Sequence, residues 1–221
     1  MKKSLLLAII AVFLLAEVSH TDNFILNSSG YENGSNVSVV IPPNTASTET
    51  FAAYFKMNLG GIDYMGYCVD YAAIGWDNPY YDFSMIPIPD QARYREAAYL
   101  FEKYGQSAPS WGKEVQLAIW EVVFDQDDKN HSVSPNSGLF YVIDPGSAKL
   151  GTVQGYVDDA IANGGTFDAS NYRLLVSPNT SDFYGEGNQD FIVKTPEPGM
   201  LALLGIGLLG LFLAARRKVI S

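Results

Sequence analysis

VQLAIWEVVF, residues 115–124, contains only two polar side chains, Gln116 and Glu121. A helix this apolar must be buried on most of its sides, and the pattern predicts one that begins after Ser110 and ends near Phe124. A buried primary amide without hydrogen bonds costs about 1–3 kcal/mol. Gln116 therefore needs a partner that the rest of the fold supplies.

Two more helices and five strands are predicted around this segment. One helix is expected from a cap at Asp90 to about Tyr104, with Gly105 after it, and another over residues 147–162. Runs of β-branched and aromatic residues predict strands at residues 37–41, 51–57, 64–71, 172–177 and 190–194. Strands first, helices in the middle and strands last indicate an α+β fold, in which a β-sandwich or barrel-like framework carries an inserted helical subdomain.

Cys68, the only cysteine of the chain, lies in the strand expected over residues 64–71. The two-residue period of a strand places it on one face with Gly66 and Asp70, opposite the more apolar face that carries Tyr67. Glycine at that position permits another element to approach closely. The strand therefore presents a small nucleophile beside a gap in its surface.

The helix that contains Gln116 has a matching face. Gly112 lies one turn before Gln116 and Trp120 one turn after it. This face offers a gap at the backbone, an amide and a large aromatic side chain. A strand that carries a thiol can approach such a face closely.

The first twenty residues are typical of a secretory signal peptide. Lys2 and Lys3 precede an apolar run over residues 5–15, which is too short to span a bilayer comfortably. We therefore expect residues 1–20 to be the signal and residues 21–195 to form one exported domain.

The chain ends with a second apolar run over residues 199–215, which as a helix would be about 26 Å long and is expected to cross the membrane. The basic residues 216–218 follow it directly. By the positive-inside rule they stay in the cytoplasm, so the domain lies outside.

The exported domain is strongly acidic. Residues 21–195 hold 22 acidic and 9 basic residues, a formal charge of −13. Such a surface repels polyanions, which excludes nucleic acid and anionic lipid surfaces as partners.

Pro196, Glu197 and Pro198 stand just before the apolar run. The order of this motif, an apolar helix and a basic cluster resembles the PEP-CTERM sorting signal of Gram-negative bacteria. The resemblance covers residues 196–221 and implies an exosortase-type processing enzyme as a partner. It also implies a protein that is first anchored in the inner membrane through its C-terminal helix and then moved to the envelope, outer surface or extracellular matrix.

The exported domain has a resemblance of its own. An aromatic-Cys-aliphatic-acid segment at Cys68, followed by aliphatic-Gln-x-Ala-Ile-Trp around Gln116, resembles the TQXA-type thioester domains of bacterial surface adhesins. The resemblance runs from Phe51 to Phe124 and more weakly to Val193. It departs from the family at Glu114, before Val115, where a threonine sometimes stands, and in the tail, because the best-known members are Gram-positive cell-wall proteins.

The resemblance implies an internal thioester between Cys68 and Gln116, formed with loss of ammonia. An amine of an unidentified protein or polysaccharide target would then attack the acyl carbon, in a single covalent attachment rather than enzymatic turnover, for adhesion or matrix crosslinking. No cofactor and no metal are required. We expect Tyr67 and Trp120, with Tyr71 and Trp76, to shield the thioester from water. Asp70 is expected to raise the pKa of the thiol, or to hold a proton for the departing ammonia.

Other interpretations remain open at this point. In a non-covalent structural or matrix component, Cys68 would be an inert core residue. In a disulfide-linked dimer, Cys68 would instead bridge two chains. A cysteine hydrolase would need a nearby histidine, and only His20 and His131 exist. Carboxylates over residues 125–130 allow a calcium site, although the EF-hand spacing is absent.

Overall fold

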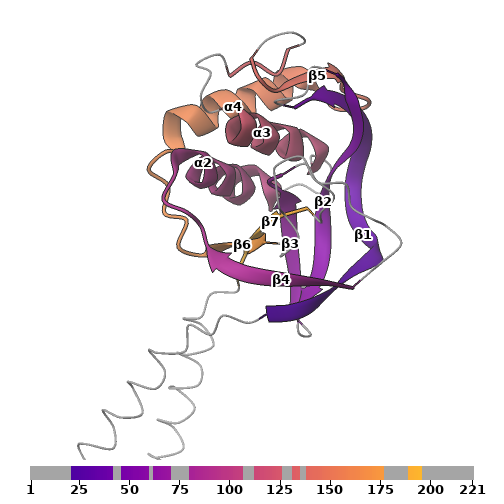
Figure 1. Cartoon of the computed structure of the whole chain (residues 1–221). Coiled ribbons are helices and arrows are strands. Elements are labelled where there is room, and N and C mark those ends of the chain that lie inside the picture. The colour runs from indigo at the N-terminus through magenta and orange to yellow at the C-terminus, as the bar shows by residue number, and fades with distance from the viewer. Residues whose placement is uncertain are drawn as a thin grey trace, which may run out of the picture.

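The computed structural model describes residues 21–41, 46–59, 62–70, 80–106, 112–125, 131–134, 138–176 and 189–195 (Figure 1). The predicted signal peptide and the predicted C-terminal helix lie outside these ranges. In chain order the strands are β1 (Thr21–Val40), β2 (Thr48–Leu59), β3 (Ile62–Cys68), β4 (Tyr80–Pro87), β5 (Tyr141–Asp144), β6 (Tyr172–Val176) and β7 (Phe191–Lys194). The helices are α2 (Ala92–Leu100), the π-helix η1 (Phe101–Gly105), α3 (Gly112–Phe124) and α4 (Leu150–Asn163).

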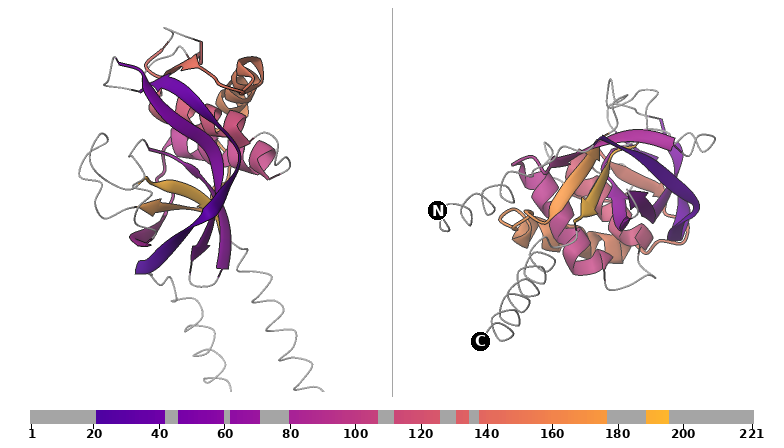
Figure 2. Two further views of the ribbon diagram at one scale, coloured as in Figure 1. Left: turned by 90° about the vertical axis from the view of Figure 1, so that its right-hand side faces the viewer. Right: turned by 90° about the horizontal axis from the view of Figure 1, so that it is seen from below.

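The strands form one antiparallel sheet in the order β2-β3-β7-β6-β4-β1-β5. β1 also pairs with β2, which closes six of the strands into a ring. Register shifts between Leu26 and Tyr31 and between Glu32 and Ser35 interrupt the pairing of β1 with β2. Such bulges bend a strand, and they allow β1 to reach β4 at one end and β5 at the other (Figure 2). The framework is therefore barrel-like.

The helices among the described residues all come between β4 and β6 in the chain and lie together beside the strands (Figure 1). α3 is central, because it contacts α2, α4, β1, β2 and β3. Eleven of its residues are buried, and Glu121 is among them. The prediction of a buried helix that begins after Ser110 and ends near Phe124 is confirmed.

Several predicted boundaries were wrong. β4 and β5 were missed, because β4 ends in the proline-rich stretch PIP and β5 has only four residues, too few to show a period of two. β3 ends at Cys68 rather than residue 71, and α4 begins at Leu150 rather than residue 147. Gln91, not Asp90, occupies the cap position of α2, since the Asp90 carboxylate pairs with Arg95 instead.

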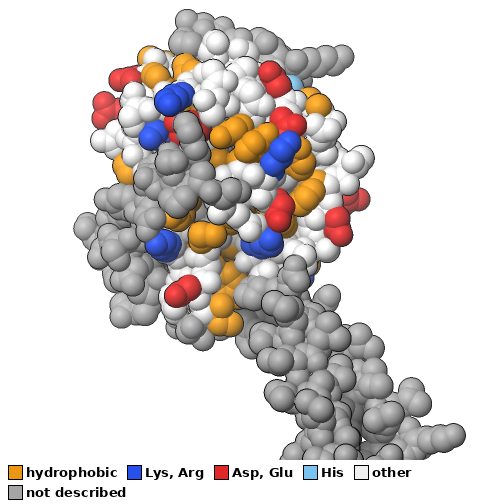
Figure 3. Space-filling view, turned by 180° about the vertical axis from the view of Figure 1, so that it is seen from behind, with side chains coloured by type: hydrophobic (Ala, Val, Ile, Leu, Met, Phe, Trp, Pro, Cys, Tyr) orange, Lys and Arg blue, Asp and Glu red, His pale blue; other side chains and the backbone are white. Residues whose placement is uncertain are grey.

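The surface drawn in Figure 3 shows acidic, basic and apolar side chains interspersed. The lysine and arginine side chains on this face stand apart from one another rather than forming a continuous basic stripe.

Asp159 joins α2 and η1 to α4. Its Oδ2 atom accepts hydrogen bonds from the hydroxyls of Tyr99 at 3.0 Å and Tyr104 at 2.7 Å, and from Lys103 Nζ at 2.6 Å. Burial alone would raise the pKa of this carboxyl, but the hydrogen bonds from Lys103, Tyr104 and Tyr99 outweigh it and lower the pKa to about 2. The ionised form of Asp159 is thus favoured in the folded protein.

We expect Asp159→Asn to lower the free energy of unfolding at pH 7 by about 1 kcal/mol, a modest value because the Lys103 ammonium is well exposed. The folded pKa lies below the unfolded value of about 3.9. The contribution of Asp159 is therefore present above about pH 4 and is lost as pH falls toward 2. Urea unfolding at several pH values measures this. Asp158→Asn, one residue away, is the control, and equal losses for the two variants at pH 7 would contradict the assignment.

Candidate functional site

Cys68 and Gln116 meet inside the core. The backbone N–H of Cys68 donates to Gln116 Oε1 at 2.9 Å, and Gln116 Nε2 donates to the Cys68 carbonyl oxygen at 2.8 Å. Both residues are completely buried. The reciprocal pair satisfies the Gln116 amide, so the partner that this glutamine needs is the backbone of the cysteine.

Strand pairing explains why this position is open to a side chain. β2 pairs with β3 only as far as Phe55 opposite Gly66, so no β2 residue stands opposite Cys68. On the other edge, Cys68 lies opposite Phe191 of β7. The Gln116 carboxamide makes the two hydrogen bonds that a neighbouring strand would otherwise supply, and it leaves no backbone group of Cys68 unpaired on that edge.

The thiol itself contacts a second glutamine. Cys68 Sγ donates to Gln189 Oε1 at 3.0 Å, and Gln189 is 6 % exposed. Burial raises the pKa of the Cys68 thiol well above its ordinary value, and the carboxylates of Asp70 and Asp190 raise it further. The cysteine is therefore held as a neutral thiol in the folded protein.

Two of the aromatic residues predicted to shield the thioester, Tyr67 and Trp120, are described, and both are buried. Tyr67 is buried and packs edge-on against Phe101, with ring centroids 5.0 Å apart. Trp120 is completely buried and lies 6.4 Å from the ring of Phe140. Both predicted shielding residues thus lie in the same hydrophobic cluster as Cys68. The other two, at positions 71 and 76, lie outside the described residues.

Gly66 accommodates β7 rather than the helix. A Cβ atom at this position would stand 2.9 Å from the carbonyl oxygen of Ile192, 3.0 Å from Val193 Cγ1 and 2.2 Å from Met57 Cε. Glycine therefore leaves room for Met57 of β2 and for β7 beside β3, and Gln189 lies just before β7.

Neither Gln189 nor Asp190 was predicted as a site residue, although Asp190 falls in the strand expected over residues 190–194. They lie in a polar stretch just before a short strand, where no local pattern distinguishes them from an ordinary turn. They reach Cys68 only because β3 pairs with β7. The hydrogen bond between Cys68 and Gln189 joins residues that are 121 positions apart in the sequence.

His131, the described histidine of the hydrolase interpretation, is held to α4 through its main chain, and its imidazole Nδ1 is buried without a hydrogen-bond partner among the described residues. The backbone oxygen of His131 accepts a hydrogen bond from Gln154 Nε2 of α4 at 2.7 Å. The first residue of the calcium interpretation, Asp125, is buried and accepts the backbone N–H of Leu139 at 2.8 Å, and the remaining residues of that loop, 126–130, are not among those described. Within the described ranges, no three His, Cys, Asp or Glu side chains are grouped to hold a metal.

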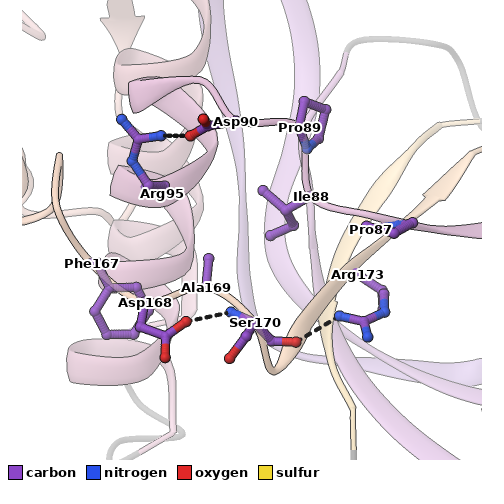
Figure 4. Close-up of a pocket in the computed structure, with 10 residues that line it drawn as sticks. All are labelled: Pro87, Ile88, Pro89, Asp90, Arg95, Phe167, Asp168, Ala169, Ser170 and Arg173. Carbon is purple, nitrogen blue, oxygen red and sulfur yellow. Dashed lines mark hydrogen bonds and ion pairs between the residues drawn. The ribbon is translucent and has the colours of Figure 1, made fainter. Parts of the chain in front are cut away.

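A surface hollow of about 270 Å³ lies apart from the buried pair (Figure 4). Its polar groups already bind one another: Asp90 pairs with Arg95, Asp168 accepts the backbone N–H of Ser170, and Arg173 donates to the backbone oxygen of Ser170. Neither Cys68 nor Gln116 lines it. The hollow offers few free polar groups to a ligand.

The last described strand runs directly into a known sequence signal. β7 ends at Lys194, and the backbone N–H of Thr195 donates to the oxygen of Asn171 at 2.8 Å. Residues 194–218 match the PEP-CTERM protein-sorting motif. The chain is therefore an exported protein that is sorted by an exosortase-type enzyme and associated with the cell envelope or surface. The predicted motif residues Pro196, Glu197 and Pro198 fall inside the match, and they lie outside the described residues.

Comparisons with curated proteins and with solved structures find no match to this chain. Among the described residues, none of the helices has the length and apolar character needed to cross a membrane. The predicted membrane segment over residues 199–215 was not among them.

Proposed function

We propose that the exported domain, residues 21–195, holds an internal thioester between Cys68 Sγ and Gln116 Cδ and uses it once to attach covalently to an amine on a target. The observation that carries this proposal is the reciprocal hydrogen-bonded pair between the Gln116 carboxamide and the Cys68 backbone. It keeps the only cysteine beside a glutamine carboxamide in a site without solvent exposure.

Formation of the thioester balances without a cofactor. The S–C bond forms between Cys68 Sγ and Gln116 Cδ, the C–N bond of the carboxamide breaks, and the thiol proton leaves with the nitrogen as ammonia. The Cys68 N–H already donates to Gln116 Oε1, so it polarises the carbonyl that is attacked. The same donor stabilises the negative oxygen of the tetrahedral intermediate.

The site is also suited to preserving a thioester. Burial excludes water, and the features that raise the pKa of the thiol make its thiolate a poor leaving group. When an amine attacks, its nitrogen bonds to Cδ, the C–S bond breaks, and one amine proton passes to sulfur. A nucleophile that does not transfer a proton to the departing sulfur is therefore disfavoured.

The charge of the domain favours a cationic amine. A formal charge of −13 over residues 21–195 attracts a lysine ammonium group and repels anionic surfaces. We therefore propose lysine-bearing proteins as the target class, in adhesion to a surface or in crosslinking of an extracellular matrix.

One observation favours a second function. Cys68 is completely buried within the hydrophobic core, as a packing residue would be. In that case the domain is a non-covalent structural component, and Gln116 serves only to complete the edge of β3. Such burial also means that a disulfide to a second chain would require the core to open.

Mass spectrometry distinguishes the two functions. Full-length protein, exported from a Gram-negative host and purified, should be lighter than its peptide composition requires by one ammonia. Cys68→Ala and Gln116→Ala should show no such deficit. A wild-type protein of full mass, with one thiol that titrates on unfolding, would disprove the thioester and leave the structural function.

A further inference from the structure

We propose that Gln189 is a positioning residue for Cys68, both when the thioester forms and when it opens. This role rests on the proposed thioester. The Cys68 thiol donates its proton to Gln189 Oε1 at 3.0 Å, and not to Gln116, whose carboxamide is committed to the Cys68 backbone. The Gln116 amide thus binds the backbone of Cys68, and the Gln189 amide binds its thiol.

The backbone that follows Gln189 is held in place beside Cys68. The carbonyl oxygen of the next residue, Asp190, accepts the backbone N–H of Val69 at 3.0 Å, and Phe191 lies opposite Cys68 in the sheet. With 6 % exposure, the Gln189 side chain has little access to water as an alternative partner. The S–H bond is therefore directed toward Gln189, just before β7, and not toward the Gln116 carboxamide.

The carboxamide can serve the site in both of its chemical states. Toward the thiol, Gln189 presents its carbonyl oxygen as an acceptor. The thioester sulfur has no proton, and rotation of the amide by half a turn then presents the NH2 group as a donor. On amine attack this donor stabilises the negative charge that develops on sulfur as the C–S bond breaks.

A neutral amide suits this position because negative charge is already present. Asp70 and Asp190 both act on the thiol, and both disfavour its thiolate. A carboxylate at position 189 would add a third negative group and would supply no donor. A protonated carboxyl, in contrast, has one donor and one acceptor and reproduces the amide.

The test uses the full-length exported protein with Gln189→Met and Gln189→Glu. The probe is hydroxylamine, an amine that remains nucleophilic in mild acid, and the readouts are the ammonia deficit and the rate of hydroxylamine uptake by intact mass. Gln189→Met should form and open the thioester about tenfold more slowly than wild type, as expected for the loss of one buried hydrogen bond. Gln154→Met, a partly buried glutamine of α4 that binds the backbone near residue 131, is the matched control.

Gln189→Glu supplies a readout that loss of packing would not produce. The rate of this variant relative to wild type should rise as pH falls and the introduced carboxyl becomes protonated. Wild-type rates in Gln189→Met, or a relative rate in Gln189→Glu that does not change with pH, would overturn the positioning role and leave the thioester intact. If wild type itself shows no ammonia deficit, the proposed function fails, and this role fails with it. If Gln189→Met does not fold, the pH series on Gln189→Glu decides alone.

Discussion

Gln116→Glu should abolish covalent capture completely: wild-type protein incubated with methylamine should gain its mass as an amide at residue 116, and the variant should gain nothing. The substitution preserves the length of the side chain and the acceptor for the Cys68 N–H. It replaces an amide that loses ammonia by a carboxylate, which thiols do not attack. Intact mass before and after incubation measures the difference. Gln154→Glu should capture methylamine as wild type does.

The same variant should acquire a pH-dependent stability. Residue 116 is completely buried, so desolvation raises the folded pKa of an introduced carboxyl above its unfolded value of about 4.3. At low pH the protonated carboxyl can still donate to the Cys68 carbonyl oxygen. As pH rises from about 4 to the folded pKa, the free energy of unfolding falls by about 1.4 kcal/mol for each pH unit. A variant whose urea midpoint relative to wild type is constant from pH 4 to pH 7 would show that residue 116 is solvated, contrary to the structure.

Trp120→Ala should be among the most destabilising single substitutions in the domain. The side chain is completely buried and packs against Phe140. Truncation of a buried tryptophan costs about 3–5 kcal/mol. Since whole domains are stable by only about 5–15 kcal/mol, the variant should unfold at a much lower urea concentration. Trp120→Ala protein that stays folded should hydrolyse the proposed thioester faster than wild type does, because the cavity admits water near residue 116.

Trp120→Phe separates packing from hydrogen bonding. The indole Nε1 of Trp120 finds no hydrogen-bond partner among the described residues. The phenylalanine variant therefore loses volume but no hydrogen bond, and it should cost clearly less than the alanine variant. Equal costs for the two variants would show that the indole N–H has a partner essential to the fold.

The sequence by itself determined the features that depend on neighbouring residues. VQLAIWEVVF has too few polar residues to form a polar helix face, so a buried helix was expected. The stretch forms most of α3. The same composition required a partner for Gln116. The sorting motif at 194–218 was also readable, since such a signal is a short linear pattern that does not depend on the fold.

The tertiary structure decided which groups meet. The Gln116 amide binds the Cys68 backbone across 48 residues, and the Cys68 thiol turns to Gln189 across 121. The first contact exists because β2 stops pairing with β3 at Gly66, and the second because β7 completes the other edge. Where one strand stops pairing and another begins is set by the closure of the sheet and by the bulges of β1, and neither leaves a local pattern in the residues concerned. For that reason a meeting of Cys68 with Gln116 was predictable, whereas the binding of the amide to the cysteine backbone and the role of the second glutamine were not.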